Sequence, residues 1–573
     1  MGSLFSSLDI AVSGLLAHQA AIQVTGHNIA NVDTDGYSRQ RAELVSQVPQ
    51  ITPYGPLGRG VTVADIFRIR NRFLDNVFQN ETENFLELSV ERDFLLRIQD
   101  IFQEPGEIGL SALMDEFFSS VQALANYPEQ LPLRASLIAS ASVLAESFND
   151  VDSRLQQIRT DANNEIIMRV SEVNSLTEQL AELNRSIIRA EADGTVANDF
   201  RDQRTVLLDE LAELVDIYTV EMSNGSVSVL VGGDVLVEGT YWSELATQVN
   251  PALDPDRGDL VDIVTASSGR VLNISGGRFR GLLDIRDVYA PEVATRVNDL
   301  ATTLIFEFNR IHSQGSGLTG FTSLTSDNAV LDPLADLDDS VATGLTFTPT
   351  DGSFEIDVMD SFGTSWTMTV ITVDLDGVGV DDSLTDLAAN IDAVANISAS
   401  VSADNRLVIT ADPTYSFTLS HDTSNVLAVV GSNTFFSGSD ASDMVVNPVI
   451  VNDPTLIAAS LSQNPLNTGD NRNALAMAAL QETAVLDSGT STLNDYYEQT
   501  IGNLGTTTRR ASDEAIIAES FRRNIDRRRE EVAGVSLDEE AANLTRFQRG
   551  YQASARVFSV IDELLDTLVN GLI

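Results

Sequence analysis

Histidines are the side chains best suited to acid–base chemistry or metal binding near neutral pH, and this chain has few of them. They lie far apart: His18, His27, His312 and His421. No two have the spacing of a metal-binding helix motif. Cysteine is absent, which excludes disulfides, thiolate nucleophiles and cysteine-bound zinc. Neither a G-x-S-x-G nucleophile pattern nor a P-loop occurs. We therefore assign no residue to catalysis, to a cofactor or to a metal, and we do not expect an enzyme.

Two short motifs resemble ligand sites but stand in the wrong context. Residues 315–320 fit G-x-G-x-x-G, yet they follow a predicted helix instead of a strand, so we interpret them as a flexible helix exit. The acidic segment Asp374–Asp382 resembles a calcium loop. Its Gly377 comes too early, however, and Thr385 stands where an EF-hand has its last glutamate. An acidic turn between a strand and a helix fits better, and calcium binding stays an open alternative.

Charge narrows the range of partners. The chain has 84 acidic and 35 basic residues, a formal net charge of −49, and every basic residue is an arginine. Because nucleic acids and anionic lipids are bound by basic surfaces, we expect neither nucleic acid nor membrane as a partner. No uninterrupted apolar run long enough to span a bilayer stands out either. We interpret the absence of lysine as codon usage that favours arginine, with adaptation to salt as the alternative hypothesis.

Both ends of the chain carry apolar residues at seven-residue spacing, which is typical of coiled coils. At the N-terminus these are Leu8, Leu15, Ile22 and Ile29, with Val12 completing the first pair and Gln19 and Gly26 weakening the later ones. At the C-terminus they are Leu544, Tyr551, Phe558, Leu565 and Leu572, accompanied by Phe547, Ile561 and Leu568, with Ser554 in the remaining slot. A capping box at Ser536–Glu539 predicts a helix from about Leu537. We predict that these two stripes form an assembly interface, with each other or with neighbouring subunits.

The middle of the chain predicts an elongated, multidomain α+β protein. Helical periodicity fills residues 65–216, and Asn224-Gly225 between alternating runs predicts a hairpin over 218–231. Residues 292–312 read as another helix, and a β-rich stretch poor in arginine follows. We therefore expect three domains. They are a terminal coiled-coil domain (1–58 and 533–573), a mostly helical body (59–325 and 450–532) and an inserted β-rich domain (326–449).

The segment from Asn28 to Gln40 closely resembles the signature of bacterial flagellar axial proteins, whose shared core is A-N-x-x-T-x-G-Y. The residues that carry the match are Asn28, Asn31, Thr34, Gly36, Tyr37, Arg39 and Gln40. The Ser38-Arg39-Gln40 extension is similar to the hook-associated members in particular. Residues 534–557, which include an Asp-Glu-Glu-Ala-Ala-Asn run, resemble the last helix of the same family.

The resemblance implies a structural subunit of the flagellum. Such proteins assemble as a short helical annulus between hook and filament, in contact with the hook protein and with a second junction protein. A chaperone binds the C-terminal helix before type III export, which uses no cleaved signal. The first arginine is Arg39, so no basic signal-peptide region precedes it. Two other readings remain open: another axial component such as the hook protein, and an adhesin-like surface protein.

Overall fold

The computed structural model describes residues 2–52, 55–102, 106, 109–254, 258–360, 366–462 and 467–570. The chain forms two compact units, each built from segments that are distant in the sequence. Unit 1 contains Met1–Asp93, Thr160–Arg286 and Arg509–Ile573, and unit 2 contains Phe94–Arg159 and Asp287–Thr508. The boundaries between these units fall inside long helices. The three domains expected from the sequence are a different partition and remain a prediction.

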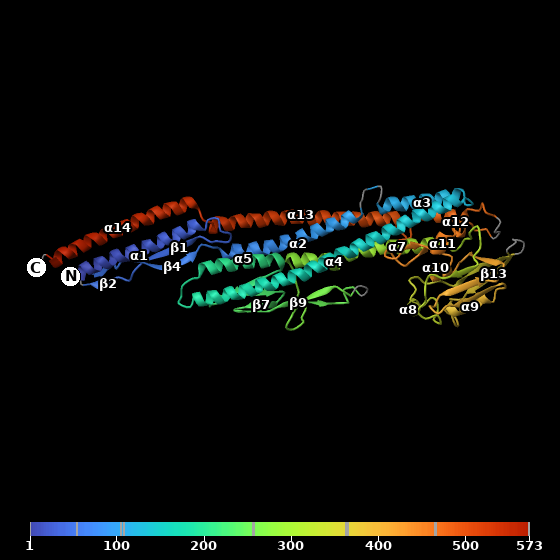
Figure 1. The fold of residues 1–573 in the computed structure, drawn as a ribbon, viewed down its shortest axis with the longest axis horizontal. Coiled ribbons are helices and arrows are strands. Elements are labelled where there is room, and N and C mark those ends of the chain that lie inside the picture. Colours follow the sequence, from blue (N-terminus) through green and yellow to red (C-terminus); the bar gives the residue numbers. More distant parts are fainter. Residues whose placement is uncertain are drawn as a thin grey trace. The chain divides into compact units, whose positions relative to one another are not determined.

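Unit 1 contains both terminal helices, α1 (Gly2–Ala30) and α14 (Leu537–Asn570). Strands β1 (Gln40–Ser46) and β4 (Val61–Arg68) form an antiparallel pair, as do β2 (Gln50–Thr52) and β3 (Gly55–Leu57). Helix α1 packs against α14 and against the β1–β4 pair. The start of α1 therefore lies beside the end of α14, as Figure 1 shows.

Three long helices pass through the unit boundaries: α2 (Arg72–Phe102), α4 (Leu131–Ala190) and α13 (Leu493–Ala533). With its 60 residues, α4 is about 90 Å long at 1.5 Å per residue. Helix α5 (Asn198–Leu214) follows α4. The helical periodicity predicted over 65–216 is confirmed from α2 onward, whereas residues 65–68 belong to β4.

Small antiparallel sheets complete unit 1. The predicted hairpin is confirmed, because β5 (Tyr218–Glu221) pairs with β6 (Val227–Val231) around Gly225, whose φ is 85°. The same sheet continues with β7 (Asp234–Glu238) and β8 (Tyr241–Trp242), and β9 (Leu245–Val249) pairs with β10 (Val261–Thr265). Helix α6 (Gly277–Asp284) follows, and a π-helical turn, η1 (Ile285–Tyr289), leads from it into unit 2.

Unit 2 has an aromatic core between α3 (Leu110–Asn126), α7 (Ala290–His312) and the start of β17 (Phe436–Ser437). The rings in contact are Phe117, Phe118, Phe308, Phe435 and Phe436, with centroids 4.9–6.4 Å apart. The predicted helix over 292–312 is therefore confirmed as α7. The glycine segment after it is not a flexible exit, because a Cβ on Gly317 would lie 2.5 Å from the Thr455 carbonyl oxygen.

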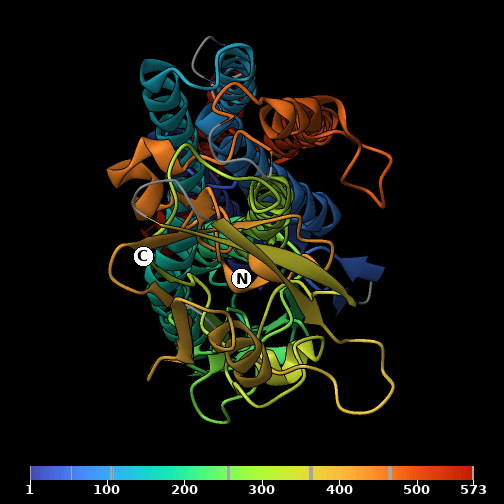
Figure 2. The same cartoon turned by 90° about the vertical axis from the view of Figure 1, so that its right-hand side faces the viewer.

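The β-rich region of unit 2 contains two three-stranded antiparallel sheets, with strand orders β11-β15-β14 and β13-β12-β16. Figure 2 shows their longest strands as broad yellow and gold arrows. The strands are β11 (Ser323–Thr325), β12 (Gly352–Asp360), β13 (Trp366–Val373), β14 (Ile397–Val401), β15 (Leu407–Ala411), β16 (Tyr415–Ser420) and the β17 (Phe436–Ser437) and β18 (Val445–Val446) pair. The helices are α8 (Ser340–Thr343), α9 (Leu384–Asp392), α10 (Val426–Val430), α11 (Pro448–Asn452), η2 (Pro454–Leu456), α12 (Arg472–Ala479) and η3 (Leu480–Glu482).

Within α1, the segment Leu4–Ala30 is long and apolar enough to cross a membrane by length and composition, among the residues searched. The sequence analysis found no uninterrupted apolar run there, and the averaged hydropathy of the helix shows that such a run is not needed to reach this limit. The helix is a mixture of Ala, Gly, Leu, Ile and Val that is interrupted by weakly polar residues. Its mean hydropathy is therefore high although no unbroken apolar run is visible. In the structure this helix packs along α14.

Candidate assembly site at the terminal helices

The α1 side of the contact with α14 is lined by small side chains. Buried residues of α1 recur every three or four positions: Ala11, Gly14, Ala17, Ala21, Val24, Thr25 and Asn28. A Cβ on Gly14 would lie 2.7 Å from the Ser554 Oγ, and a Cβ on Gly550 would lie 2.6 Å from the His18 ring. Gly14 meets Ser554 whereas His18, later on α1, meets Gly550, earlier on α14, so the two helices run antiparallel. The small residues allow the helices to approach closely.

The heptad residues predicted on α1 are only partly covered within the chain. Leu8, Leu15, Ile22 and Ile29 are half-buried, and Val12 is 37% exposed. The most buried positions of the helix form an adjacent face, made mostly of small side chains. An assembly interface through the heptad residues, with α14 or with neighbouring subunits, stays a prediction.

The predicted residues of α14 fall into two groups. Ile561 is buried, and Phe547 lies beside His18 with ring centroids 6.3 Å apart. The others are more accessible: Leu544, Phe558 and Leu565 are half-buried, and Tyr551 is 40% exposed. The Leu568 side chain and the whole of Leu572 lie outside the described residues.

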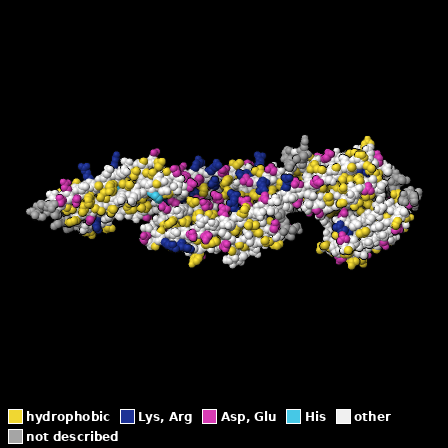
Figure 3. All heavy atoms as spheres, viewed as in Figure 1, with side chains coloured by type: hydrophobic (Ala, Val, Ile, Leu, Met, Phe, Trp, Pro, Cys, Tyr) yellow, Lys and Arg dark blue, Asp and Glu magenta, His cyan; other side chains and the backbone are white. Residues whose placement is uncertain are grey.

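Both terminal helices keep large apolar side chains on their surface. On α1 these are Phe5, Ile10, Val12 and Leu16, and on α14 they are Tyr551, Val557, Val560 and Leu564. Figure 3 shows yellow hydrophobic side chains gathered over these two helices. Contiguous exposed apolar surface of this kind marks interaction sites on proteins. The paired terminal helices therefore offer a surface that another chain can cover.

Asn28 connects the end of α1 to β1 and to α14. Its Nδ2 donates to the Gln40 carbonyl oxygen (2.9 Å) and to the Glu540 Oε2 (3.1 Å). Its Oδ1 accepts from the Gln40 N–H (2.9 Å) and from the Tyr37 hydroxyl (2.7 Å). All four hydrogen bonds are made by a side chain that is 1% exposed. An asparagine is suited to this position because its amide both donates and accepts.

The next motif residues shape the turn that follows α1. The Asn31 Nδ2 donates to the His27 carbonyl oxygen (3.0 Å), and the Thr34 hydroxyl donates to the Asn31 Oδ1 (3.2 Å). The Tyr37 ring meets the His27 ring edge-on, with centroids 5.4 Å apart. Burial raises the pKa of the Tyr37 hydroxyl, and the carboxylates of Asp199, Asp202 and Glu540 raise it further. The hydroxyl therefore stays protonated and can donate to Asn28.

Arg39 joins this turn to the start of α14. Its guanidinium binds Glu540 at 2.7 Å and Glu539 at 2.7 Å, and its backbone N–H donates to the Ala533 carbonyl oxygen at 2.8 Å. Helix α14 begins at Leu537 as predicted, and the Ser536 Oγ accepts from the Glu539 N–H at 3.5 Å. The other half of the predicted capping box differs, because the Glu539 carboxylate accepts from Arg39 across 500 residues of sequence.

Gln40 and Ser38 dock the same turn onto α5. The Gln40 Nε2 donates to the Asp199 Oδ1 (2.6 Å), and the Ser38 N–H and hydroxyl donate to Asp202 at 2.9 and 2.6 Å. Asp202 also pairs with Arg68 of β4 at 2.8 Å. The motif thus contacts α5 on one side and α14 on the other, so one short segment fixes the start of α14 against the rest of unit 1.

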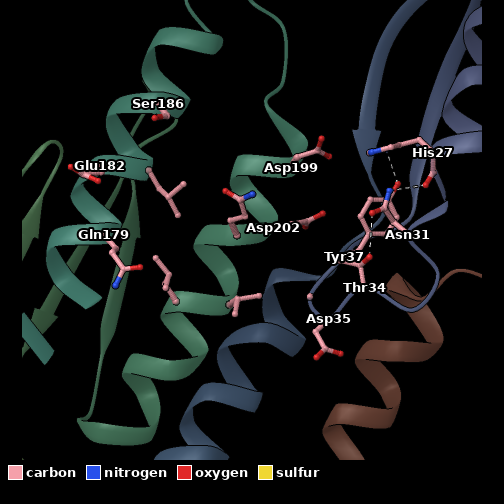
Figure 4. A pocket seen from close by; sticks show the side chains of 15 residues that line it. His27, Asn31, Thr34, Asp35, Tyr37, Gln179, Glu182, Ser186, Asp199 and Asp202 are labelled. Atoms are coloured by element: carbon pink, nitrogen blue, oxygen red, sulfur yellow. Dashed lines mark hydrogen bonds between the residues drawn. The ribbon is translucent and has the colours of Figure 1, made fainter. Parts of the chain in front are cut away.

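Gly36 allows the turn to lie directly against α5. Its φ is 74°, and a Cβ there would be 2.2 Å from the Val206 Cγ2. Beside it is a cavity of about 700 Å³ between this turn, α4 and α5. Figure 4 shows His27, Asn31 and Tyr37 on one side and Gln179, Glu182 and Ser186 of α4 on the other. Its rim is acidic, through residues that include Asp35, Glu182 and Asp199.

Arg529 is a connection that the sequence did not reveal. It lies near the end of α13, which continues to Ala533. The Arg529 guanidinium binds Asp75 at 3.0 Å and Asp209 at 2.6 Å, and it lies 4.1 Å from the centre of the Phe78 ring. It thereby ties the end of α13 to α2 and α5.

The acidic segment before α9 is a turn, as expected. The Asp376 Oδ1 accepts from the Val378 N–H at 2.7 Å, and the Asp381 Oδ1 accepts from the Gly377 N–H at 3.1 Å. Asp374, Asp376 and Asp381 bring one carboxylate oxygen each within 4.8 Å of one another. These residues are largely exposed, and exposed acidic groups are often this close without an ion. Calcium binding at this loop stays an open alternative.

Three family models match parts of the chain. The model described as "Flagellar hook-associated protein FlgK helical domain" matches residues 95–325. "Flagella basal body rod protein" matches 8–37, and "Flagellar basal body rod FlgEFG protein C-terminal" matches 528–571. The two terminal matches cover most of α1 and α14.

Named relatives match over nearly the whole length. "Flagellar hook-associated protein 1" of Salmonella typhimurium is 28% identical, with 99% of both chains covered. The proteins of the same name from Bacillus subtilis and Escherichia coli are 27% and 26% identical, again with at least 99% coverage. The chain is therefore similar to flagellar hook-associated protein 1 over nearly its whole length.

A solved structure has the same fold. The flagellar hook junction protein FlgK from Burkholderia pseudomallei aligns with a TM-score of 0.51 at 16% identity, covering 80% of this chain and all of that one. The α+β architecture expected from the sequence is therefore confirmed. The similarity to these proteins also agrees with a structural subunit of the external flagellum that assembles with other flagellar proteins.

Proposed function

We propose that this chain is a structural subunit of the hook–filament junction of the bacterial flagellum and assembles through α1 and α14. The observation that carries the proposal is the exposed apolar surface on these paired terminal helices, which include Leu16, Val560 and Leu564. A heterologous contact repeated around a helical axis would bury this surface and build a short annulus. This role requires no catalytic chemistry.

The Asn28–Gln40 turn would set the geometry of that annulus. It holds the start of α14 through Arg39 and Asn28, and it holds α5 through Gln40 and Ser38. The direction in which the terminal helices leave the rest of unit 1 then depends on these contacts. We assign the motif residues a positioning role: they orient the surface that neighbouring subunits contact.

The family resemblance supports the choice of partners. In this proposal the annulus contacts the hook protein on one side and a second junction protein on the other. An export chaperone covers α14 before the chain leaves the cell through the flagellar channel, without a cleaved signal. Such a chaperone would shield Val557, Val560 and Leu564, which are exposed in the single chain and would otherwise favour aggregation.

The test is a pair of matched substitutions on α14. Leu564→Asp puts a charge on the exposed apolar stripe, and Gln552→Asp puts the same charge on an exposed polar position of the same helix. We expect the first to abolish assembly and motility, and the second to leave both close to wild type. Circular dichroism of the purified variants checks that both remain folded. Normal junctions with Leu564→Asp would contradict the proposal.

Phe558→Asp is a harsher version of the same test. Phe558 is half-buried, so its replacement disturbs packing within the chain as well as the outer surface. We expect it to abolish assembly while residues 65–531 stay folded. Protease-resistant fragments from that region would report the folded body, and a variant that still forms junctions would speak against the terminal helices as the interface.

A further inference from the structure

Helices α2 and α6 of unit 1 approach each other closely because α6 presents a glycine. A Cβ on Gly281 would lie 2.6 Å from the Glu87 carbonyl oxygen and 3.0 Å from the Val90 Cβ. This contact brings Asp284, at the end of α6, next to two glutamates one helical turn apart on α2, Glu87 and Glu91. One carboxylate oxygen from each of the three lies within 4.8 Å of the other two.

The charge of this cluster is only partly balanced by the described residues around it. Arg280 pairs with Asp284, whose side chain is 13% exposed, and its positive charge also acts on Glu87 and Glu91. Glu91 is only 7% exposed, and no described donor or cation makes a hydrogen bond or ion pair with its carboxylate. The other charged groups that act on Glu91 or Glu87 are acidic, namely Asp216 and Glu514. A buried carboxylate without a hydrogen-bond partner is costly, so the arrangement calls for a cation or for protons.

We propose that Glu87, Glu91 and Asp284 bind a calcium ion. Calcium prefers carboxylate oxygens at about 2.3–2.6 Å, so one ion can contact three oxygens that lie within 4.8 Å of one another. Glu87 is half-exposed, which leaves room for water to complete a coordination number of six to eight. Magnesium requires stricter octahedral geometry at about 2.0–2.1 Å, which two glutamates of one helix and an aspartate of another satisfy less readily.

The site would be structural. A bound ion would connect α2 to α6 through charges that otherwise repel each other, and α6 leads through η1 into α7. Binding to the folded chain alone raises its stability, so calcium should raise the melting temperature of the purified subunit. This inference does not depend on the proposed function, because the ligands lie outside the terminal helices.

The experiment measures the melting temperature of the purified full chain in EDTA, in calcium chloride and in magnesium chloride at pH 8. We expect calcium in about hundredfold excess over its dissociation constant to raise it by about 2 °C, and magnesium to raise it much less. Glu91→Gln should abolish the calcium shift while leaving the melting temperature in EDTA unchanged or higher, since it removes an unpaired buried charge. If Glu91→Gln does not fold, Glu87→Gln serves as the second variant.

The matched control is the exposed acidic turn. Asp376→Asn removes one of its carboxylates and should leave the calcium shift intact. The assignment is overturned if calcium does not move the wild-type melting temperature, or if magnesium moves it equally. A shift that survives Glu91→Gln and disappears with Asp376→Asn would also overturn it, because the ion would then bind at the turn.

Discussion

Asn28→Ala is the sharpest single perturbation of the turn after α1. The substitution removes four hydrogen bonds and leaves two buried backbone groups of Gln40, its N–H and its carbonyl oxygen, without their partner. Each orphaned buried group costs about 1–3 kcal/mol. The Tyr37 hydroxyl keeps a second partner in the His27 Nδ1 at 3.2 Å, and Glu540 keeps Arg39. We therefore expect a local loss of about 3 kcal/mol.

Hydrogen–deuterium exchange of the purified subunit measures this local loss. A change of about 3 kcal/mol corresponds to exchange of the Gln40 amide that is on the order of a hundredfold faster. Peptides from the first turns of α14 should also exchange faster, because Asn28 donates to Glu540. Peptides from the aromatic core of unit 2 serve as an internal reference that should not change.

Asn31→Ala is the matched control. The Asn31 side chain donates to the His27 carbonyl oxygen and accepts from the Thr34 hydroxyl, both at the exposed surface where water can replace it. We expect exchange at Gln40 to rise by less than about fivefold, which corresponds to at most about 1 kcal/mol. Equal effects of the two substitutions would refute the argument that burial and the number of hydrogen bonds give Asn28 its role.

Three further changes test other parts of unit 1. Arg529→Gln leaves Asp75 and Asp209 without their shared guanidinium, and we expect a loss of about 3 kcal/mol in urea denaturation; a loss below about 1 kcal/mol would argue against this role. Gly36→Ala, at a φ of 74° and 2.2 Å from Val206, should lower the melting temperature, whereas Gly26→Ala, with no atom within 4 Å, should not. Burial raises the pKa of Glu83 to about 8 from 4.5, so the folded chain retains a proton that the unfolded chain loses between these values. The free energy of unfolding should therefore fall as pH rises through this window, by at most about 1.4 kcal/mol per pH unit from this group, and Glu83→Gln should flatten the curve.

Regular elements were predictable wherever a periodic pattern met a clear terminator. The hairpin at Asn224-Gly225, the helix start at Leu537 and the helix ending at His312 all follow from local spacing and local turn chemistry. These signals involve residues a few positions apart, so the sequence contains all the information that they need.

The contact face of α1 was not predictable from hydropathy. Gly14, Ala17 and Ala21 are buried, and Gly14 lies directly against Ser554 of α14, but small side chains add little to an apolar pattern. The neighbouring stripe of Leu8, Leu15 and other large residues is more visible in the sequence but only half-buried in the structure. The periodic pattern therefore located the helix but not its most buried face.

The partners of the motif residues could not be found from the sequence. Gln40 and Ser38 bond to Asp199 and Asp202, two of 84 acidic residues, and the two sides of each contact are about 160 positions apart. Arg39 reaches Glu540 across 501 positions. Such pairings depend on how α5 and α14 are placed by the rest of unit 1. Motif resemblance identified one side of each contact, and the fold was needed to identify the other.

Electron microscopy of cells that lack this gene, combined with an assay for filament subunits in the medium, tests the junction role most directly. We predict complete hooks without filaments and filament subunits released into the medium. Restoring the gene should restore filaments, and restoring it with Leu564→Asp should not. Absent hooks would place the chain in the hook or rod, and normal filaments would contradict a role at the junction.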